Sequence, residues 1–300
     1  MARLDSTSKS LLGLLMNEDF DYNEAEPDEE PPVDEFEQGA VPAIEELISE
    51  QRVVTEREVK VRLEDRFFPW VTGRALRKMV EKGMILQQGL AGRRGRMEIK
   101  NFYSLPDLKY DDIIGLMREK KAVAREVNAM LTGPAPATYF AEDLFERAFQ
   151  TLGFEIIDRD ASYYEGFRVT RVKGKVPPNI DFVIKRDKVT YGADIKNWLR
   201  YEVDTREEIR SKVNVALQLN VVPFVIARYA DKATIFKDVI EKGEICYPYK
   251  TLIFPPDLDS LAIKASRVLG YPVIALDRLP LYKMKHIDFL HRNYLSKHEA

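Results

Sequence analysis

Two aspartates and a lysine in the stretch NIDFVIKRDKVTYGADIKN have the residue types and the spacing of a hydrolytic site. A hairpin folded at the Asp-Lys dipeptide in its middle places Asp181 opposite Asp194. Opposed side chains on paired strands have Cβ atoms roughly 4.5–5.5 Å apart, and two like charges there are destabilising. A divalent ion between the carboxylates removes that penalty. Lys196 can then orient or deprotonate an attacking water, or stabilise developing charge.

The apolar residues of the two strands support the same register. Side chains alternate between the two faces of a strand, so six apolar residues share one face, which must be core. The pairs are Phe182 with Ala193, Ile184 with Tyr191, and Ile180 with Ile195. A shift of one residue would scatter this set. Asp181, Asp194 and Lys196 then share the other face with Val183 and Gly192.

An α/β domain is expected around the hairpin. YFAEDLFERAFQTLGFEII reads as a helix that runs into a strand at Phe154, and GFRVTRVKG is a further candidate strand. DTREEIRSKVNVALQLN reads as a helix, and VVPFVIARY as a wholly apolar strand buried on both faces. We therefore expect the order helix–strand–strand–strand–helix–strand, αβββαβ, with a mixed sheet over 138–229.

The pairing of NID with DIK thirteen residues after its aspartate resembles the PD-(D/E)XK nuclease superfamily, whose restriction-endonuclease-like core has this element order. The resemblance implies Mg²⁺-dependent hydrolysis of DNA phosphodiesters, with Mn²⁺ as a substitute metal. Asp181 matches the first acid, Asp194 the second, where Glu is commoner, and Lys196 the lysine. The backbone carbonyl of Ile195 matches a usual additional metal ligand.

A helix glutamate completes the metal site in many members of this superfamily. EDLFERAFQTLGF resembles the Mrr-like and archaeal-resolvase-like form, which assigns the role to Glu142. Glu146 lies one turn later on the same face and is the alternative. The competing interpretation of the whole motif is a surface hairpin with a Lys–Asp pair.

A second region precedes this domain and resembles a winged helix-turn-helix. Helices are expected at VPAIEELISEQ, at TEREVKVRLEDRF with a capping box of Thr55 and Glu58, and at PWVTGRALRKMVEKG, closed by Gly83. The strands MILQQGL and MEIKNFYSL follow, joined by AGRRGR. Cations there can neutralise phosphates or reach base edges. The resemblance assigns DNA contact to Arg74, Arg77 and Lys78 on the third helix and to Arg93, Arg94 and Arg96 in the wing. A solvated face or a protein-interaction module is the alternative.

The charge of the chain is uneven. Residues 17–38 hold eleven Asp or Glu and no Lys or Arg, which leaves 46 basic and 38 acidic residues elsewhere. An acidic tail on a basic body is common in proteins that meet nucleic acid, and a solubilising tail is equally compatible. We expect a disordered acidic tail over 1–40, a winged-helix domain over 41–105, a helical connector and linker over 106–137, and a nuclease-like domain over 138–300.

Composition narrows the class of protein. A hydrophobic fraction of 45% and a charged fraction of 32% are ordinary for a globular protein. Cys246 is the single cysteine, which excludes an internal disulfide framework and favours a reducing, cytoplasmic setting. No apolar run is long enough to span a membrane. His286 and His291 are five residues apart, which fits one helical face poorly, so we expect surface histidines.

Three further groups of residues are ambiguous in the sequence. Asn197 and Trp198 could line a DNA path, although Trp198 is equally suited to packing. Arg200 could line the same path. On the helix after the hairpin, a stripe of Arg210, Asn214 and Gln218 could face phosphate, but an exposed polar face is the simpler interpretation.

The sequence therefore predicts a Mg²⁺-dependent DNA endonuclease positioned by a winged helix. Cutting both strands of a duplex would favour a homodimer with two sites. Two other functions stay open. A non-catalytic DNA-binding regulator would keep the nuclease fold as a scaffold, and an assembly factor would recruit a protein partner through the acidic tail.

Overall fold

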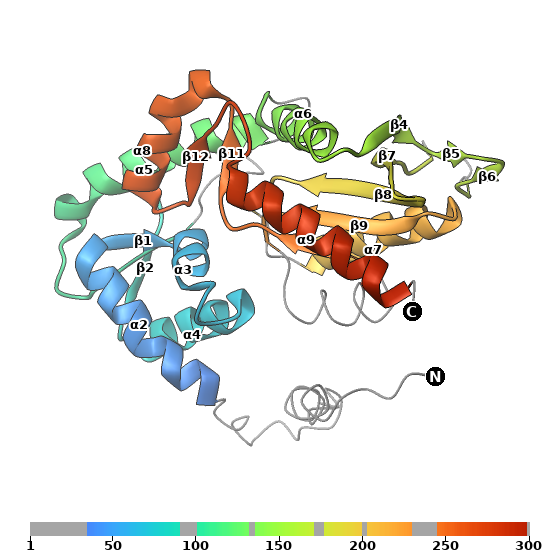
Figure 1. The fold of residues 1–300 in the computed structure, drawn as a ribbon. Helices are drawn as coiled ribbons and strands as arrows, with labels where there is room; N and C mark the ends of the chain where they lie inside the picture. Colours follow the sequence, from blue (N-terminus) through green and yellow to red (C-terminus); the bar gives the residue numbers. More distant parts are fainter. Residues whose placement is uncertain are drawn as a thin grey trace, which may run out of the picture.

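A mixed five-stranded sheet organises the C-terminal half of the chain in the computed structural model (Figure 1). The structure describes residues 35–90, 101–131, 136–170, 177–199, 203–229 and 245–298. The strand order is β10-β9-β8-β7-β4; β10, β9 and β8 run parallel, whereas β7 and β4 are antiparallel to their neighbours. The strands are β4 (Glu155–Ala161), β7 (Ile180–Arg186), β8 (Val189–Lys196), β9 (Val222–Ala227) and β10 (Ile245–Pro248). The expected α/β class with a mixed sheet is confirmed.

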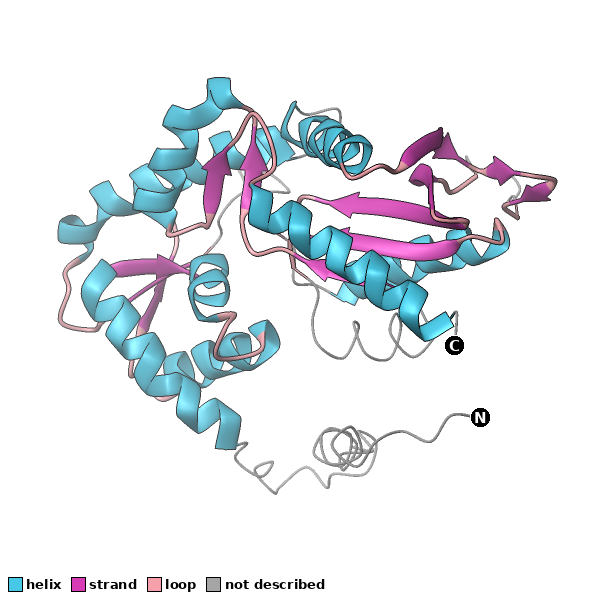
Figure 2. Ribbon diagram, viewed as in Figure 1, coloured by secondary structure: helices cyan, strands magenta, loops and turns pink. Residues whose placement is uncertain are grey.

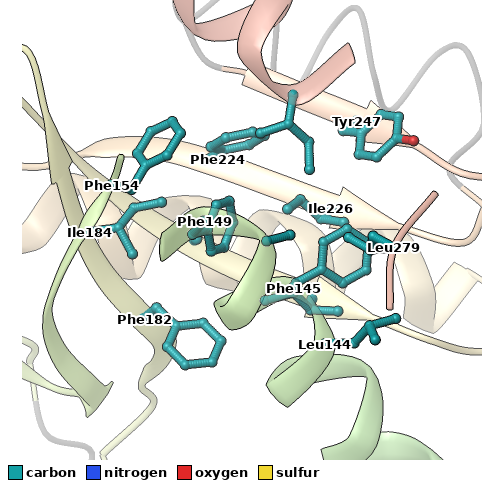
Figure 3. Packing of buried hydrophobic residues seen from close by; sticks show 14 of the residues in the cluster. Leu144, Phe145, Phe149, Phe154, Phe182, Ile184, Phe224, Ile226, Tyr247 and Leu279 are labelled. Carbon is teal, nitrogen blue, oxygen red and sulfur yellow. The ribbon is translucent and has the colours of Figure 1, made fainter. Parts of the chain in front are cut away.

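Helices cover both faces of this sheet (Figure 2). α6 (Pro136–Thr151) and α9 (Leu281–His298) contribute to the core on one face, where aromatic side chains of helix and strand interlock (Figure 3). Phe149 meets Phe154 and Phe224 edge to face, with ring centroids 5.5 and 6.0 Å apart. α7 (Val203–Gln218) packs on the other face through Val213, Val215 and Ala216. Each buried large apolar side chain stabilises the fold by about 1.5–3 kcal/mol.

The register of the β7–β8 hairpin is confirmed for the residues that pair. Phe182 lies opposite Ala193 and Ile184 opposite Tyr191. The turn falls at Asp187 and Lys188, which both adopt positive φ (47° and 67°), as a two-residue hairpin turn requires.

The expected position of Ile180 is wrong. Its side chain packs with Val183 on the α7 face instead of with Ile195. The backbone pairing of β7 with β8 ends at Phe182, and the carboxylate of Asp181 accepts a hydrogen bond from the N–H of Ile195. Alternation along β7 therefore breaks where the two strands separate.

The predicted strand at GFRVTRVKG is described only in part. Only Phe167–Arg168 forms a strand, β6, which pairs with β5 (Tyr163–Tyr164) in a small separate hairpin; residues 171–176 lie outside the described residues. The expected order nevertheless appears as α6, β4, β7, β8, α7 and β9, with this hairpin inserted after β4.

The N-terminal region has its own sheet and core. Its elements are α2 (Glu35–Gln51), β1 (Val53–Thr55), α3 (Glu56–Leu63), α4 (Pro69–Glu81), β2 (Leu86–Gln88) and β3 (Phe102–Ser104), with strand order β1-β3-β2. The capping box of Thr55 and Glu58 is present, and Gly83 adopts a positive φ of 68° after α4. Two differences stand out: α2 begins at Glu35, inside the expected tail, and strand β1 was not expected.

The helix expected as a connector is part of a packed junction between the two regions. α5 (Tyr110–Leu131) packs against α8 (Asp259–Leu269), beside the short parallel strands β11 (Leu252–Phe254) and β12 (Val273–Ala275) and the 3-10 turn Pro256–Leu258. Lys120 Nζ donates to both carboxylate oxygens of Glu58, at 2.8 and 2.9 Å, and to the carbonyl of Val268 at 2.9 Å. Arg228 donates to both oxygens of Glu64, at 2.8 and 3.0 Å. We call these four ionised residues (Glu58, Glu64, Lys120 and Arg228) the junction cluster.

Candidate active site

The aspartates and the lysine of the motif meet where strands β7 and β8 separate. Asp181 is the second residue of β7, and Asp194 and Lys196 lie at the end of β8. The N–H of Ile195 donates to Oδ2 of Asp181 at 2.6 Å, so a side-chain carboxylate replaces the next backbone acceptor of the ladder. We call Glu142, Asp181, Asp194, Lys196 and Lys212 the carboxylate cluster.

Asp194 is the buried centre of this cluster, with 1% of its surface exposed. Lys196 Nζ lies 2.6 Å from one of its oxygens and Lys212 Nζ 3.0 Å from the other. Burial opposes ionisation, but the two ammonium groups outweigh it and hold the pKa of Asp194 below its usual range. Among the described residues, neither carboxylate oxygen of Asp194 has a hydrogen-bond partner with suitable angles, so its contacts with Lys196 and Lys212 are ion pairs.

Asp181 is in the opposite electrostatic situation. Burial, followed by repulsion from Asp194, raises its pKa to about 6. Attraction to the two lysines and the hydrogen bond from Ile195 offset only part of this increase. Near neutral pH the fold therefore holds Asp181 charged at a cost in free energy.

Glu142 joins this group from helix α6. Burial is the main cause that raises its pKa to about 7, and the charge of Asp181 is the next. Glu146, the alternative helix acid, is buried and paired with Arg159. Of the two glutamates, the structure brings Glu142 under the influence of the aspartates.

Lys196 is a cation in this setting. Burial disfavours its charge, but the carboxylates of Asp194 and Asp181 outweigh burial and raise its pKa above the usual value. A lysine with a raised pKa stays protonated at neutral pH, so it can donate hydrogen bonds and stabilise negative charge. It does not act as a general base in this state.

Helix α7 supplies two charged residues that the sequence reasoning missed. Lys212 contacts Asp194 and also donates to the carbonyl of Asn179 at 2.7 Å, while Glu208 lies 4.0 Å from Lys196 Nζ. A signal was available, because Ile209 and Val213 mark the buried face of α7 and these charges border it. The polar stripe expected on this helix does not border the carboxylate cluster. Asn214 and Gln218 are exposed, and the side-chain oxygen of Gln218 accepts a hydrogen bond from the backbone N–H of Thr170.

Gly192 lets α7 come this close. A Cβ atom built there would lie 2.7 Å from Ile180 Cδ1 and 2.9 Å from Ala216 Cβ. Such separations are shorter than ordinary van der Waals contact, so a side chain at this position would push the helix outward.

Asn197, a candidate from the sequence to line a DNA path, is buried. Its amide nitrogen donates to the carbonyls of Ala137 (3.1 Å) and Ile253 (2.7 Å), and its oxygen accepts from Ile253 N–H (3.0 Å) and the Tyr249 hydroxyl (3.1 Å). The residue after Lys196 is therefore tied to the start of α6, the helix that carries Glu142. Trp198 is also buried, with its indole N–H 3.3 Å from the carbonyl of Tyr229, and Arg200 lies outside the described residues.

The donor set suits a hard divalent cation. Mg²⁺ prefers a small number of oxygen ligands, and Asp181, Asp194, Glu142 and the Ile195 carbonyl supply only oxygen. Burial and repulsion between carboxylates raise the pKa of Asp181 and of Glu142 despite the nearby lysine charge, and a bound cation would lower both. Within the described residues, however, no three His, Cys, Asp or Glu side chains form a preassembled metal-binding group.

The residues expected to contact DNA are only partly described. Arg74 and Lys78 both pair with the buried carboxylate of Glu37 on α2. Arg77 is exposed. The expected wing residues Arg93, Arg94 and Arg96 lie outside the described part of the chain.

The expectation of a surface position for His291 is wrong. Its ring is fully buried between Tyr191, whose hydroxyl lies 2.7 Å from Nδ1, and Asp187, whose Oδ2 lies 3.0 Å from Nε2. Lys283, Ile287 and His291 are four residues apart in α9 and form its buried stripe. His291 therefore fixes α9 against the β7–β8 turn.

Comparison of the chain with protein-family models, curated proteins and solved structures gave no match. No helix in the described ranges combines the length and the apolar character needed to cross a membrane.

Proposed function

We propose that the chain is a divalent-cation-dependent DNA endonuclease of the PD-(D/E)XK type. The observation that carries the proposal is the carboxylate cluster at the separation of β7 and β8. Three carboxylates from α6, β7 and β8 influence one another there, two lysines contact the central Asp194, and the pKa values of Asp181 and Glu142 are raised to about 6 and 7. The surrounding order of α6, β4, β7, β8, α7 and β9 also supports a restriction-endonuclease-like core.

The residues would divide the work as follows. Asp181, Asp194, Glu142 and the carbonyl of Ile195 would hold Mg²⁺ or Mn²⁺. A bound divalent cation would supply Lewis acidity, lowering the pKa of a water and neutralising phosphate charge. Lys196, kept protonated by its carboxylate neighbours, would stabilise the negative charge that builds up on the phosphate or orient the attacking water.

The N-terminal region would position the enzyme on DNA as a winged helix. The order α2, β1, α3, α4, β2 and β3, with strand order β1-β3-β2, supports this assignment. Arg77 is an exposed cation on α4, and Arg74 and Lys78 would meet DNA after exchanging Glu37 for phosphate. Arg93, Arg94 and Arg96 would contact the backbone from the wing. A homodimer would be needed to cut both strands at once.

A cleavage panel tests the activity. Wild-type protein should cut at least one of plasmid, linear, branched or single-stranded DNA with Mg²⁺ or Mn²⁺, and Lys196→Ala should lose at least about a hundredfold in rate. Lys185→Ala, which removes an exposed lysine from the same hairpin, is the matched control and should cut normally. Uncut DNA throughout the panel, or equal rates for the two variants, would refute the proposal.

A non-catalytic DNA-binding regulator is the second candidate. The observation in its favour is that two ammonium groups already contact Asp194, and the described residues contain no preassembled metal group. This candidate predicts DNA binding that is unchanged by chelation of divalent ions, with no cleavage of any substrate. The same panel therefore separates the two functions.

A further inference from the structure

The outer face of α4 carries an excess of positive charge beside an exposed aromatic ring. Residues 66–82 contain five basic residues and one acidic residue. Trp70 is 54% exposed, lies parallel to Phe68 with ring centroids 5.8 Å apart, and has the guanidinium of Arg74 at 4.7 Å from its centroid. Among the described residues Trp70 is not part of a buried core cluster, so its ring is accessible beside these cations.

One acidic group already occupies part of this face. Glu37 pairs with Lys78 at 2.5 Å and with Arg74, and only 3% of its surface is exposed. Glu37 is the last carboxylate of the acidic run 17–38. The run therefore ends in contact with α4.

We propose that the remaining acidic residues, 17–34 of the same chain, bind along the α4 face and compete there with DNA phosphates. Nine Asp or Glu and no Lys or Arg lie in this segment, together with Phe20 and Tyr22. Its charge complements the five basic residues of 66–82, and its aromatic side chains match the exposed ring of Trp70.

The geometry of the tether allows this contact. Residue 34 precedes the first residue of α2, and Glu37 in the first turn of that helix already touches α4. Eighteen residues can extend up to about 60 Å, whereas the thirteen residues of α4 are about 20 Å long. A short tether also gives the segment a local concentration in the millimolar range.

The competition rests on the proposed function, because it needs α4 to be a DNA-binding surface. Phosphates and carboxylates would exchange on Arg77, Arg74 and Lys78. The acidic segment would then weaken non-specific DNA binding, and only a substrate that contacts several cations at once would displace it.

DNA binding by full-length protein without divalent ions provides the first test. The variant has all nine acidic residues of 18–34 replaced by their amides, and the control keeps the nine carboxylates in shuffled order. At about 50 mM salt the amide variant should bind duplex DNA at least about tenfold more tightly than wild type, and the gap should close as salt rises. The shuffled control should behave as wild type. Equal affinities for the amide variant and wild type at low salt would overturn the competition.

Fluorescence without DNA provides the second test. Trp70 and Trp198 are the two tryptophans, and Trp198 is buried, so Trp198→Phe leaves Trp70 as the reporter. Acrylamide should quench Trp70 more strongly in the amide variant than in the shuffled control. Equal quenching would overturn the contact itself. If quenching differs but neither protein binds DNA, the contact stands and the DNA-binding part of the proposed function fails.

Discussion

The junction cluster and the carboxylate cluster are both buried groups of charge, but they balance that charge differently. In the junction each carboxylate contacts a cation: Glu58 meets Lys120 and, at 3.5 Å, Arg62, and Glu64 meets Arg228. In the carboxylate cluster both lysines contact Asp194. At Asp181 and Glu142, burial and repulsion between carboxylates outweigh the attraction to lysine. A carboxylate in contact with a cation joins parts of a fold, whereas carboxylates whose charge is not offset are a reason to bind a cation.

The pKa shifts also distinguish the two clusters. In the junction, burial raises the pKa of Glu58 and lowers that of Lys120 even though the two are paired. Burial therefore opposes the charged form of both partners of this pair. In the carboxylate cluster, repulsion from Asp194 adds to burial at Asp181. Four substitutions test this contrast.

The largest effect should follow from Glu64→Ala in the junction. The buried guanidinium of Arg228 would lose its bidentate carboxylate, which costs about 3–5 kcal/mol of unfolding free energy. Urea unfolding measures the loss. Asp65→Ala is the matched control, because the Asp65–Lys250 pair is exposed and worth at most about 1 kcal/mol. Equal losses for the two variants would mean that the junction pair has no special role.

Asp181→Asn should instead stabilise the protein at neutral pH. The pKa of Asp181 is about 6 in the folded protein and 3.8 in the unfolded chain. Protonated Asp181 therefore contributes stability to the fold below pH 3.8, and this contribution is lost as the pH rises through about 6. At pH 8 the substitution should recover up to about 3 kcal/mol, and at about pH 4 almost nothing. Mg²⁺ should raise the melting temperature of wild type more than that of the variant.

Asp187→Asn is the control of opposite sign. A hydrogen bond from His291 lowers the pKa of Asp187, so its contribution is present above the unfolded pKa and is lost as pH falls. This variant should melt at a lower temperature than wild type at neutral pH and match it in acid. A gain in stability from Asp187→Asn, or a loss from Asp181→Asn at pH 8, would contradict the charge assignment.

Asn197→Ala should produce a smaller loss of stability and a looser site. Removing the amide strands the buried carbonyls of Ala137 and Ile253, which costs about 1–3 kcal/mol. The tie between β8 and α6 would also weaken, so the Mg²⁺ concentration needed to raise the melting temperature should increase. Asn214→Ala, on the exposed face of α7, should change neither quantity. An unchanged Mg²⁺ dependence in Asn197→Ala would limit this residue to a packing role.

Gly192→Ala should have the smallest effect, about 1 kcal/mol of destabilisation from overpacking against Ile180 and Ala216. Gly115→Ala is its control, since an added Cβ there meets nothing within 4 Å and alanine favours a helix by about 0.5–1 kcal/mol. Thermal unfolding of both variants compares them directly. A Gly192→Ala protein as stable as Gly115→Ala would show that α7 can move without cost.

The sequence predicted the elements whose pattern is local. The alternation of apolar residues predicted the pairing of Phe182 with Ala193, and the Thr55–Glu58 spacing predicted a capping box. The burial of Ile180 on the other face was not predictable, because it follows from a side-chain hydrogen bond between separate strands.

Contacts between charged residues far apart in the sequence were likewise not predictable from a local pattern. Nothing near Lys120 in sequence indicates Glu58, sixty-two residues away. Burial of His291 was predictable from its spacing to Lys283 and Ile287, whereas its spacing to His286 carries no such signal. The charges of α7 bordered an identifiable apolar stripe and were also within reach of the sequence.

The hydrogen bond from Ile195 to Asp181 has a spectroscopic consequence. At 2.6 Å the amide proton of Ile195 points at a carboxylate oxygen, so its chemical shift should change as Asp181 gains or loses a proton. A cation that drew Oδ2 away would shift the same resonance. The amide of Ile195 is therefore a reporter that follows the ionisation and the occupancy of the cluster without any added probe.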